Sequence, residues 1–153
     1  MWGREHDCTA GDDGIGVLAL SDLGVTTTAA GTGLTVPVFN GALVLGGVAG
    51  VGFAVALART AHSWGKQTVA VLLGLTTLTM ALIGLFPLGT ALHVPVAITF
   101  YVLVSVLLWA DGLLTLVGGN PRRGVGTLVL GTANLGVWIA WGASSGASQP
   151  GAA

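Results

Sequence analysis

Residues 38–57 read VFNGALVLGGVAGVGFAVAL, twenty consecutive residues without a charged side chain. A helix of about 20 apolar residues crosses the roughly 30 Å of hydrocarbon in a bilayer. Further uncharged runs extend from Gln67 to Ala110 and from Gly124 to the end of the chain. The runs are continuous and lack the alternation of a transmembrane barrel. They predict an all-α protein, a polytopic transmembrane helical bundle with four spans.

The composition supports the same environment. Of the 153 residues, 53% are hydrophobic and 7% are charged, and the mean hydropathy is +0.88. A soluble domain carries about a quarter charged residues, so lipid is the better solvent for this surface. The net charge of −1 offers no basic stripe for phosphates, and we expect no nucleic-acid partner. Cys8 is the single cysteine, which excludes an internal disulfide.

The chain divides into three parts by composition. Residues 1–37 form an extramembrane N-terminal segment that contains the turn Ser21-Asp22-Leu23-Gly24, residues 38–143 a transmembrane domain, and residues 144–153 a disordered tail. The four spans within the domain are expected at about 38–58, 67–86, 91–113 and 125–143.

Positive charges predict the orientation of these spans. Arg59 and Lys66 follow the first span, and Arg122 and Arg123 follow the third, whereas the loop at 87–93 has no Lys or Arg. Lys and Arg are enriched in short cytoplasmic loops. We therefore expect a multi-pass protein of the cell membrane with both basic loops inside and both chain ends outside.

Small residues mark two faces on which helices could approach closely. Gly46 and Gly50 are four residues apart in the first span, as are Thr132, Gly136 and Ala140 in the fourth. Helices in lipid associate through such faces because the hydrophobic effect offers little there. The glycine-rich faces are therefore predicted packing surfaces, and they leave homo-oligomerisation open.

The stretch GLFPLGTALHVP, residues 84–95, predicts an outward-facing turn. Pro87 ends one helix, Gly89 permits a tight reversal, and Thr90 is expected to cap the next helix. His93 would lie in the first turn of that helix, at the boundary of water and lipid.

Asp22 and His93 are expected on the same outer side, where a carboxylate and an imidazole could transfer a proton or bind a cation. Ser21 and Pro87 flank them as further candidate ligand contacts. The alternative is that Asp22 stabilises its own turn and His93 simply lies at the interface.

Two polar side chains within the spans have structural and functional interpretations. Asn134 lies near mid-depth, where its amide should bond another helix or contact a ligand. Asp111 should lie at the inner boundary and pair with Arg122 or Arg123, with a proton or ion pathway as the alternative. The three histidines are dispersed, so the sequence predicts no metal site and no cofactor.

Four stretches carry a family resemblance: ALSDLGV (19–25), VFNGALVLGGVAGVGFAVAL (38–57), GLFPLGTALHVPVAITFY (84–101) and GTANLGVWIAWGA (131–143). Together they resemble domain of unknown function 998, an uncharacterised membrane-protein family frequent in archaea. The resemblance implies one span before the Ser-Asp-Leu-Gly turn and often another after the last span here. Because neither is present, we expect a chain truncated at both ends.

The sequence leaves three functions open. The first is a non-enzymatic membrane component that binds a lipid or small solute at its outer face. The second is a membrane-embedded enzyme that uses Asp22 and His93 for acid-base or metal chemistry. The third is a small proton-coupled transporter, against which the absence of a broken-helix repeat speaks.

Overall fold

The computed structural model describes residues 34–147, and the surroundings of side chains for residues 34–143. This part of the chain forms four α-helices and no strand. They are α1 (Thr35–Thr60), α2 (Trp64–Leu85), α3 (His93–Val117) and α4 (Pro121–Ala147). Each is long and apolar enough to cross a membrane, so the predicted fold class is confirmed.

Three helices, α1, α2 and α4, begin before the expected spans, and in α2 and α4 a local cap satisfies a first amide. The Ser63 hydroxyl accepts from the backbone N–H of Lys66 at 3.4 Å, which starts α2 at Trp64. The Asn120 side chain accepts from the N–H of Arg123 at 3.3 Å, and Pro121 occupies the first position of α4. Lys66, Arg122 and Arg123 therefore belong to helices and not to loops.

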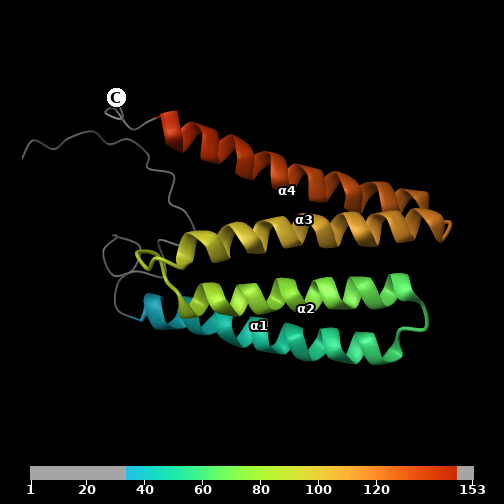
Figure 1. Ribbon diagram of the computed structural model, residues 1–153, viewed down its shortest axis with the longest axis horizontal. Helices are drawn as coiled ribbons and strands as arrows, with labels where there is room; N and C mark the ends of the chain where they lie inside the picture. The colour runs from blue at the N-terminus through green and yellow to red at the C-terminus, as the bar shows by residue number, and fades with distance from the viewer. Residues whose placement is uncertain (1–33, 148–153) are drawn as a thin grey trace, which may run out of the picture.

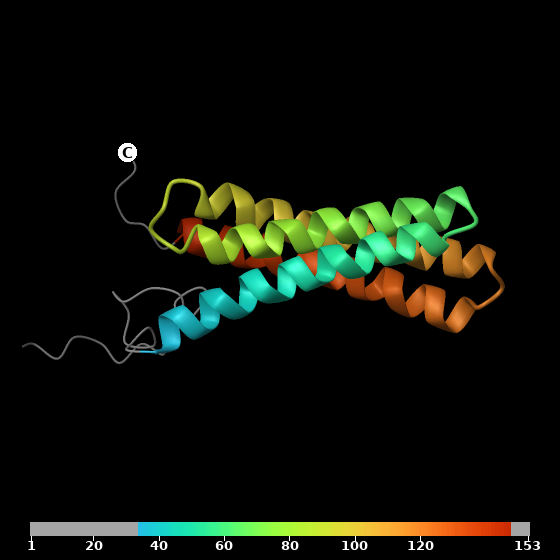
Figure 2. The same cartoon turned by 90° about the horizontal axis from the view of Figure 1, so that it is seen from below.

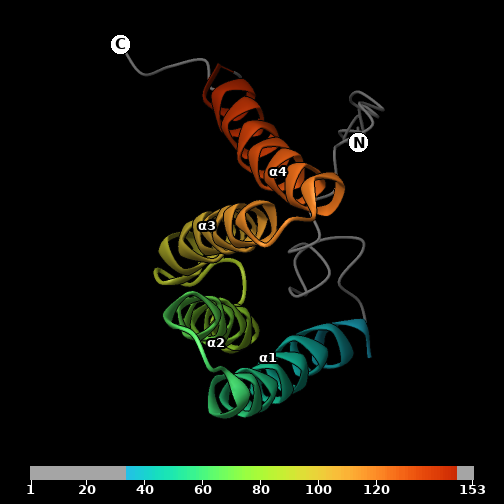
Figure 3. The ribbon, with the colours of Figure 1, turned by 90° about the vertical axis from the view of Figure 1, so that its right-hand side faces the viewer.

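The helices stand antiparallel in a row in chain order (Figure 1). Extensive contacts join α1 with α2, α2 with α3, and α3 with α4, and α1 and α4 form the two edges (Figure 3). The α1–α2 and α3–α4 connections lie at one end of the row, which here means an end along the helix axes and not an edge, as the turned view also shows (Figure 2). The start of α1, the α2–α3 turn and the end of α4 lie at the other end.

Glycines bring α1 and α2 into close contact. A Cβ added at Gly47 would lie 2.6 Å from the Ala81 Cβ and from the Thr77 carbonyl oxygen, and one added at Gly50 would overlap the Thr77 side chain. A Cβ at Gly46 would lie 2.9 Å from the end of Met80. The expected packing face on the first span is confirmed.

The contact between α3 and α4 uses a face that only partly overlaps the expected one. Cβ atoms added at Gly124 or Gly131 would lie within 3.0 Å of Leu116 or Trp109 on α3, whereas one at Gly136 meets nothing within 4 Å. Thr132, Gly136 and Ala140 are all exposed. The prediction holds for Thr132, whose hydroxyl accepts from Trp109 of α3, and is wrong for Gly136 as a contact with α3. Spacing alone does not fix the rotation of a helix, which here turns Asn134 and Gly131 toward α3.

The interior of the row is built from small side chains, while large apolar ones face outward. Ala54, Ala70, Ala81 and Ala97 are buried, and Ser105 has no exposed surface. The most exposed large side chains include Val117 at 89% and Leu45 at 73%. In water this distribution would leave a large apolar surface exposed, whereas lipid solvates it, and small residues are typical of interfaces between membrane helices.

Candidate functional site

His93 lies at the start of α3 and is buried, with 6% of its surface exposed. Its Nδ1 lies 2.8 Å from the carbonyl oxygen of Phe86, the residue that directly follows α2. The ring therefore joins the C-terminal cap of one helix to the first residue of the next. We call this end of the row, with the start of α1 and the turn 86–92, the His93 end.

The hydrogen bond of His93 determines which ring nitrogen is available for chemistry. A carbonyl oxygen can only accept, so Nδ1 must carry the proton. In the neutral ring Nε2 is then the acceptor, and among the described residues no hydrogen bond to it is found. The arrangement leaves Nε2 able to accept a hydrogen bond from a ligand.

The turn between α2 and α3 follows the predicted outline with one correction. Helix α2 ends at Leu85, before Pro87, and Gly89 adopts φ +96°, the left-handed conformation that glycine tolerates. Thr90 does not cap α3, because that helix begins three residues later. The Thr90 hydroxyl instead donates to the Pro87 carbonyl oxygen at 2.9 Å. The prediction for Thr90 was wrong because its side chain closes the turn itself.

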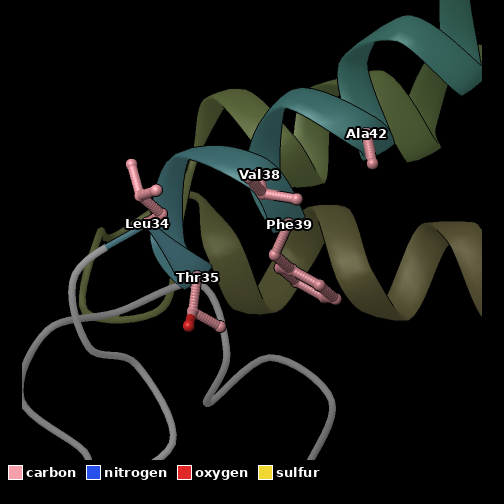
Figure 4. A pocket seen from close by; sticks show the side chains of 5 residues that line it. All are labelled: Leu34, Thr35, Val38, Phe39 and Ala42. Atoms are coloured by element: carbon pink, nitrogen blue, oxygen red, sulfur yellow. The ribbon is translucent and has the colours of Figure 1, made fainter.

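A shallow apolar groove lies on the first two turns of α1, at the His93 end (Figure 4). Its lining residues are Leu34, Thr35, Val38, Phe39 and Ala42. The side chains of Thr35, Phe39 and Ala42 point to the same side of the helix, as the four- and three-residue spacings require. Apart from Thr35 the lining offers no polar side chain, so the groove suits a hydrocarbon chain or another apolar group.

Of the other three residues of the expected outer site, the structure describes one. Ser21 and Asp22 lie outside the described residues. Pro87 is half-buried in the turn beside Phe86. The distance between the Asp22 carboxylate and the His93 ring therefore stays a prediction.

Asn134 joins α4 to α3 near the middle of the length of both helices. Its side-chain nitrogen donates to the Ser105 hydroxyl at 2.9 Å and to the Tyr101 carbonyl oxygen at 3.1 Å. Both N–H groups of the amide are thus used by α3, which is the helix-joining role considered from the sequence. Ser105 was not expected as a partner, because nothing in the sequence distinguishes it from the other small residues of the third span.

Trp109 and Asp111 make two further contacts between α3 and α4. The Trp109 indole nitrogen donates to the Thr132 hydroxyl at 3.2 Å. Asp111 pairs with Arg123 at 3.8 Å, which confirms the ion pair expected at the inner boundary. Because α3 is continuous from His93 to Val117, Asp111 lies about 27 Å along its axis from His93 and cannot act with it directly.

Metal-ligating side chains are dispersed in the described part of the chain. Residues 34–143 contain no group of three His, Cys, Asp or Glu side chains close enough to hold an ion. The chemistry visible at the His93 end is that of one imidazole at the same end of the helices as an apolar groove.

Four antiparallel apolar helices with an interior of small residues define a multi-pass membrane protein. The chain belongs to the family described as "Protein of unknown function (DUF998)", whose model matches residues 17–153. Comparison with curated proteins found no match, and comparison with solved structures found none.

Proposed function

We propose that this protein is a non-enzymatic membrane component that binds a lipid or small amphiphilic solute at its His93 end, on the outer face of the cell membrane. The observation that supports this most is the apolar groove of α1 at the same end as a buried histidine whose Nε2 has no hydrogen bond from residues 34–143. An amphiphile matches this site, because it has an apolar chain for the groove and a polar head for the imidazole.

The groove supplies the apolar half of the proposed site. Val38 is 65% exposed and Leu34 is 80% exposed, so both contribute surface that a bound chain would cover. Burial of apolar surface from water contributes about 25 cal/mol per Å², but surrounding lipid is itself apolar. The groove therefore contributes shape, and preference for one ligand depends on the polar end.

His93 supplies the polar end, and Asp22 is the proposed second polar contact. Asp22 precedes Leu34 by twelve positions, a length of chain that spans up to about 40 Å when extended. The chain between Asp22 and Leu34 is thus long enough for Asp22, with Ser21 beside it, to reach the His93 end. A hydroxyl or ammonium group of a ligand could donate to the Asp22 carboxylate, and a hydroxyl could donate to Nε2 of His93.

Native mass spectrometry of the chain purified in mild detergent tests this function, together with metal analysis. Val38→Trp should fill the groove and Leu45→Trp is the matched control, because Leu45 is exposed on the same helix outside the groove. We expect a co-purified amphiphile on the wild type and on Leu45→Trp, and its loss from Val38→Trp and His93→Ala.

Two results would contradict the proposal. The first is the absence of a bound molecule from the wild type, or its equal retention by all variants. The second is a bound metal ion that disappears in both His93→Ala and Asp22→Asn, which would favour the membrane-embedded enzyme.

A further inference from the structure

The described cations gather at the end of the row opposite His93. Arg59 lies in the last turn of α1, Lys66 in the first turn of α2, and Arg122 and Arg123 in the first turn of α4. All four residues are exposed. We call these four residues the basic end. Within residues 34–147 the His93 end contains no Lys or Arg.

This concentration of positive charge is only partly neutralised by nearby acids. Asp111 is the single carboxylate between residues 34 and 147, and it pairs with Arg123. Arg59, Lys66 and Arg122 have no acidic side chain to pair with in that part of the chain. Three cationic groups thus face the same boundary of the membrane without a described counter-charge.

An apolar groove lies on the first turns of α2, the helix to which Lys66 belongs. It is lined by Trp64, Gln67, Thr68, Val71 and Leu72, and Trp64 is 87% exposed. Indole side chains favour the level of lipid headgroups, with hydrocarbon on one side and water on the other. The groove therefore runs from headgroup depth into the apolar region, as an acyl chain does.

We propose that the basic end binds anionic phospholipids of the adjacent leaflet. Headgroup phosphates pair with Arg59, Lys66 and Arg122, and one acyl chain lies along the groove that starts at Trp64, on the same helix as Lys66. Each cation near an anionic surface favours such binding by about fivefold. The site is separate from the one proposed at the His93 end, so either can fail without the other.

Tryptophan fluorescence in reconstituted vesicles tests this directly. Phosphatidylglycerol and phosphatidylcholine with brominated acyl chains quench indoles that they contact, and they differ in headgroup charge. The fluorescence of Trp64 is obtained by subtracting the signal of Trp64→Phe from that of the wild type. The fluorescence of Trp141 is obtained in the same way with Trp141→Phe. Trp141 is the matched control because it lies toward the opposite end of the row, on α4.

We expect brominated phosphatidylglycerol to quench Trp64 severalfold more effectively than brominated phosphatidylcholine, and Trp141 equally with both. The preference at Trp64 should shrink as salt rises, because exposed charges are screened. It should also disappear when Arg59, Lys66, Arg122 and Arg123 are all replaced by Gln. The proposal is overturned if the two lipids quench wild-type Trp64 equally, or if the preference for phosphatidylglycerol does not change with salt concentration. Both results use the wild type, so they decide the matter even if the fourfold variant does not fold.

Discussion

Asn134 of α4 donates a hydrogen bond to the hydroxyl of Ser105 of α3, at a point where Ser105 has no exposed surface. The same amide also donates to the Tyr101 carbonyl oxygen. An amide facing hydrocarbon would lose these partners, so the pair fixes how α4 is rotated against α3. The position of the glycines on α4 follows from that rotation.

Replacing Asn134 should weaken the attachment of α4. Asn134→Ala removes both interhelical bonds, and we expect a loss of about 0.5–2 kcal/mol in the free energy of unfolding. Ser105→Ala should be non-additive with it, because the two side chains share one bond. Unfolding in mixed detergent micelles measures both. Thr99→Val is the control, since the Thr99 hydroxyl bonds only within its own helix, and additive effects of Asn134→Ala and Ser105→Ala would contradict the assignment.

Two glycines of α1 should respond oppositely to the same substitution. Gly47→Ala places a Cβ against the Ala81 Cβ and the Thr77 carbonyl oxygen, so α1 and α2 must move apart and stability should fall by about 1–3 kcal/mol. A Cβ at Gly52 meets nothing within 4 Å, and Gly52→Ala should be neutral or stabilising by up to about 1 kcal/mol. Thermal unfolding in detergent compares them. Equal losses in the two variants would show that Gly47 is not at the contact.

The ion pair between Asp111 and Arg123 should contribute little to stability. Its atoms are 3.8 Å apart, and the Arg123 side chain is 68% exposed. Exposed pairs contribute about 0–1 kcal/mol because water and salt screen them. Asp111→Asn should therefore change the free energy of unfolding by less than about 1 kcal/mol, measured at low and high salt. A loss of several kcal/mol would place the pair in a dry interior instead.

Single cysteines should report opposite sides of the membrane. Ser63 and Thr90 are exposed in the connections at the two ends of the row. In a Cys8→Ala background, we expect a membrane-impermeant maleimide to label Thr90→Cys on intact cells and Ser63→Cys only after permeabilisation, because the basic loops are predicted to lie inside. Labelling of Ser63→Cys on intact cells would reverse the orientation.

The sequence was sufficient for those features that depend on composition and on individual residues. Uncharged runs predicted the four helices, and Pro87 and Gly89 located the turn between α2 and α3. The Asp111–Arg123 pair followed from charges at one boundary. Each of these depends on residues that are close in the chain or confined to one depth.

Features that depend on helix rotation were harder to predict. Several glycine spacings occur in the fourth span, and only contact with Trp109 and Ser105 selects the face that contains Gly131 and Asn134. Thr90 failed as a cap because a hydroxyl can bond backward to the Pro87 carbonyl as readily as forward to a helix. The groove on α1 was not foreseen, since exposed apolar residues are spread over all four helices.

Every proposal made for this chain requires that lipid surround its exposed apolar helices, and fractionation of expressing cells tests that requirement most directly. After high-speed centrifugation the chain should be found in the membrane pellet, resist an alkaline wash, and enter solution only with detergent. Recovery of a folded monomer in the detergent-free supernatant would contradict the account.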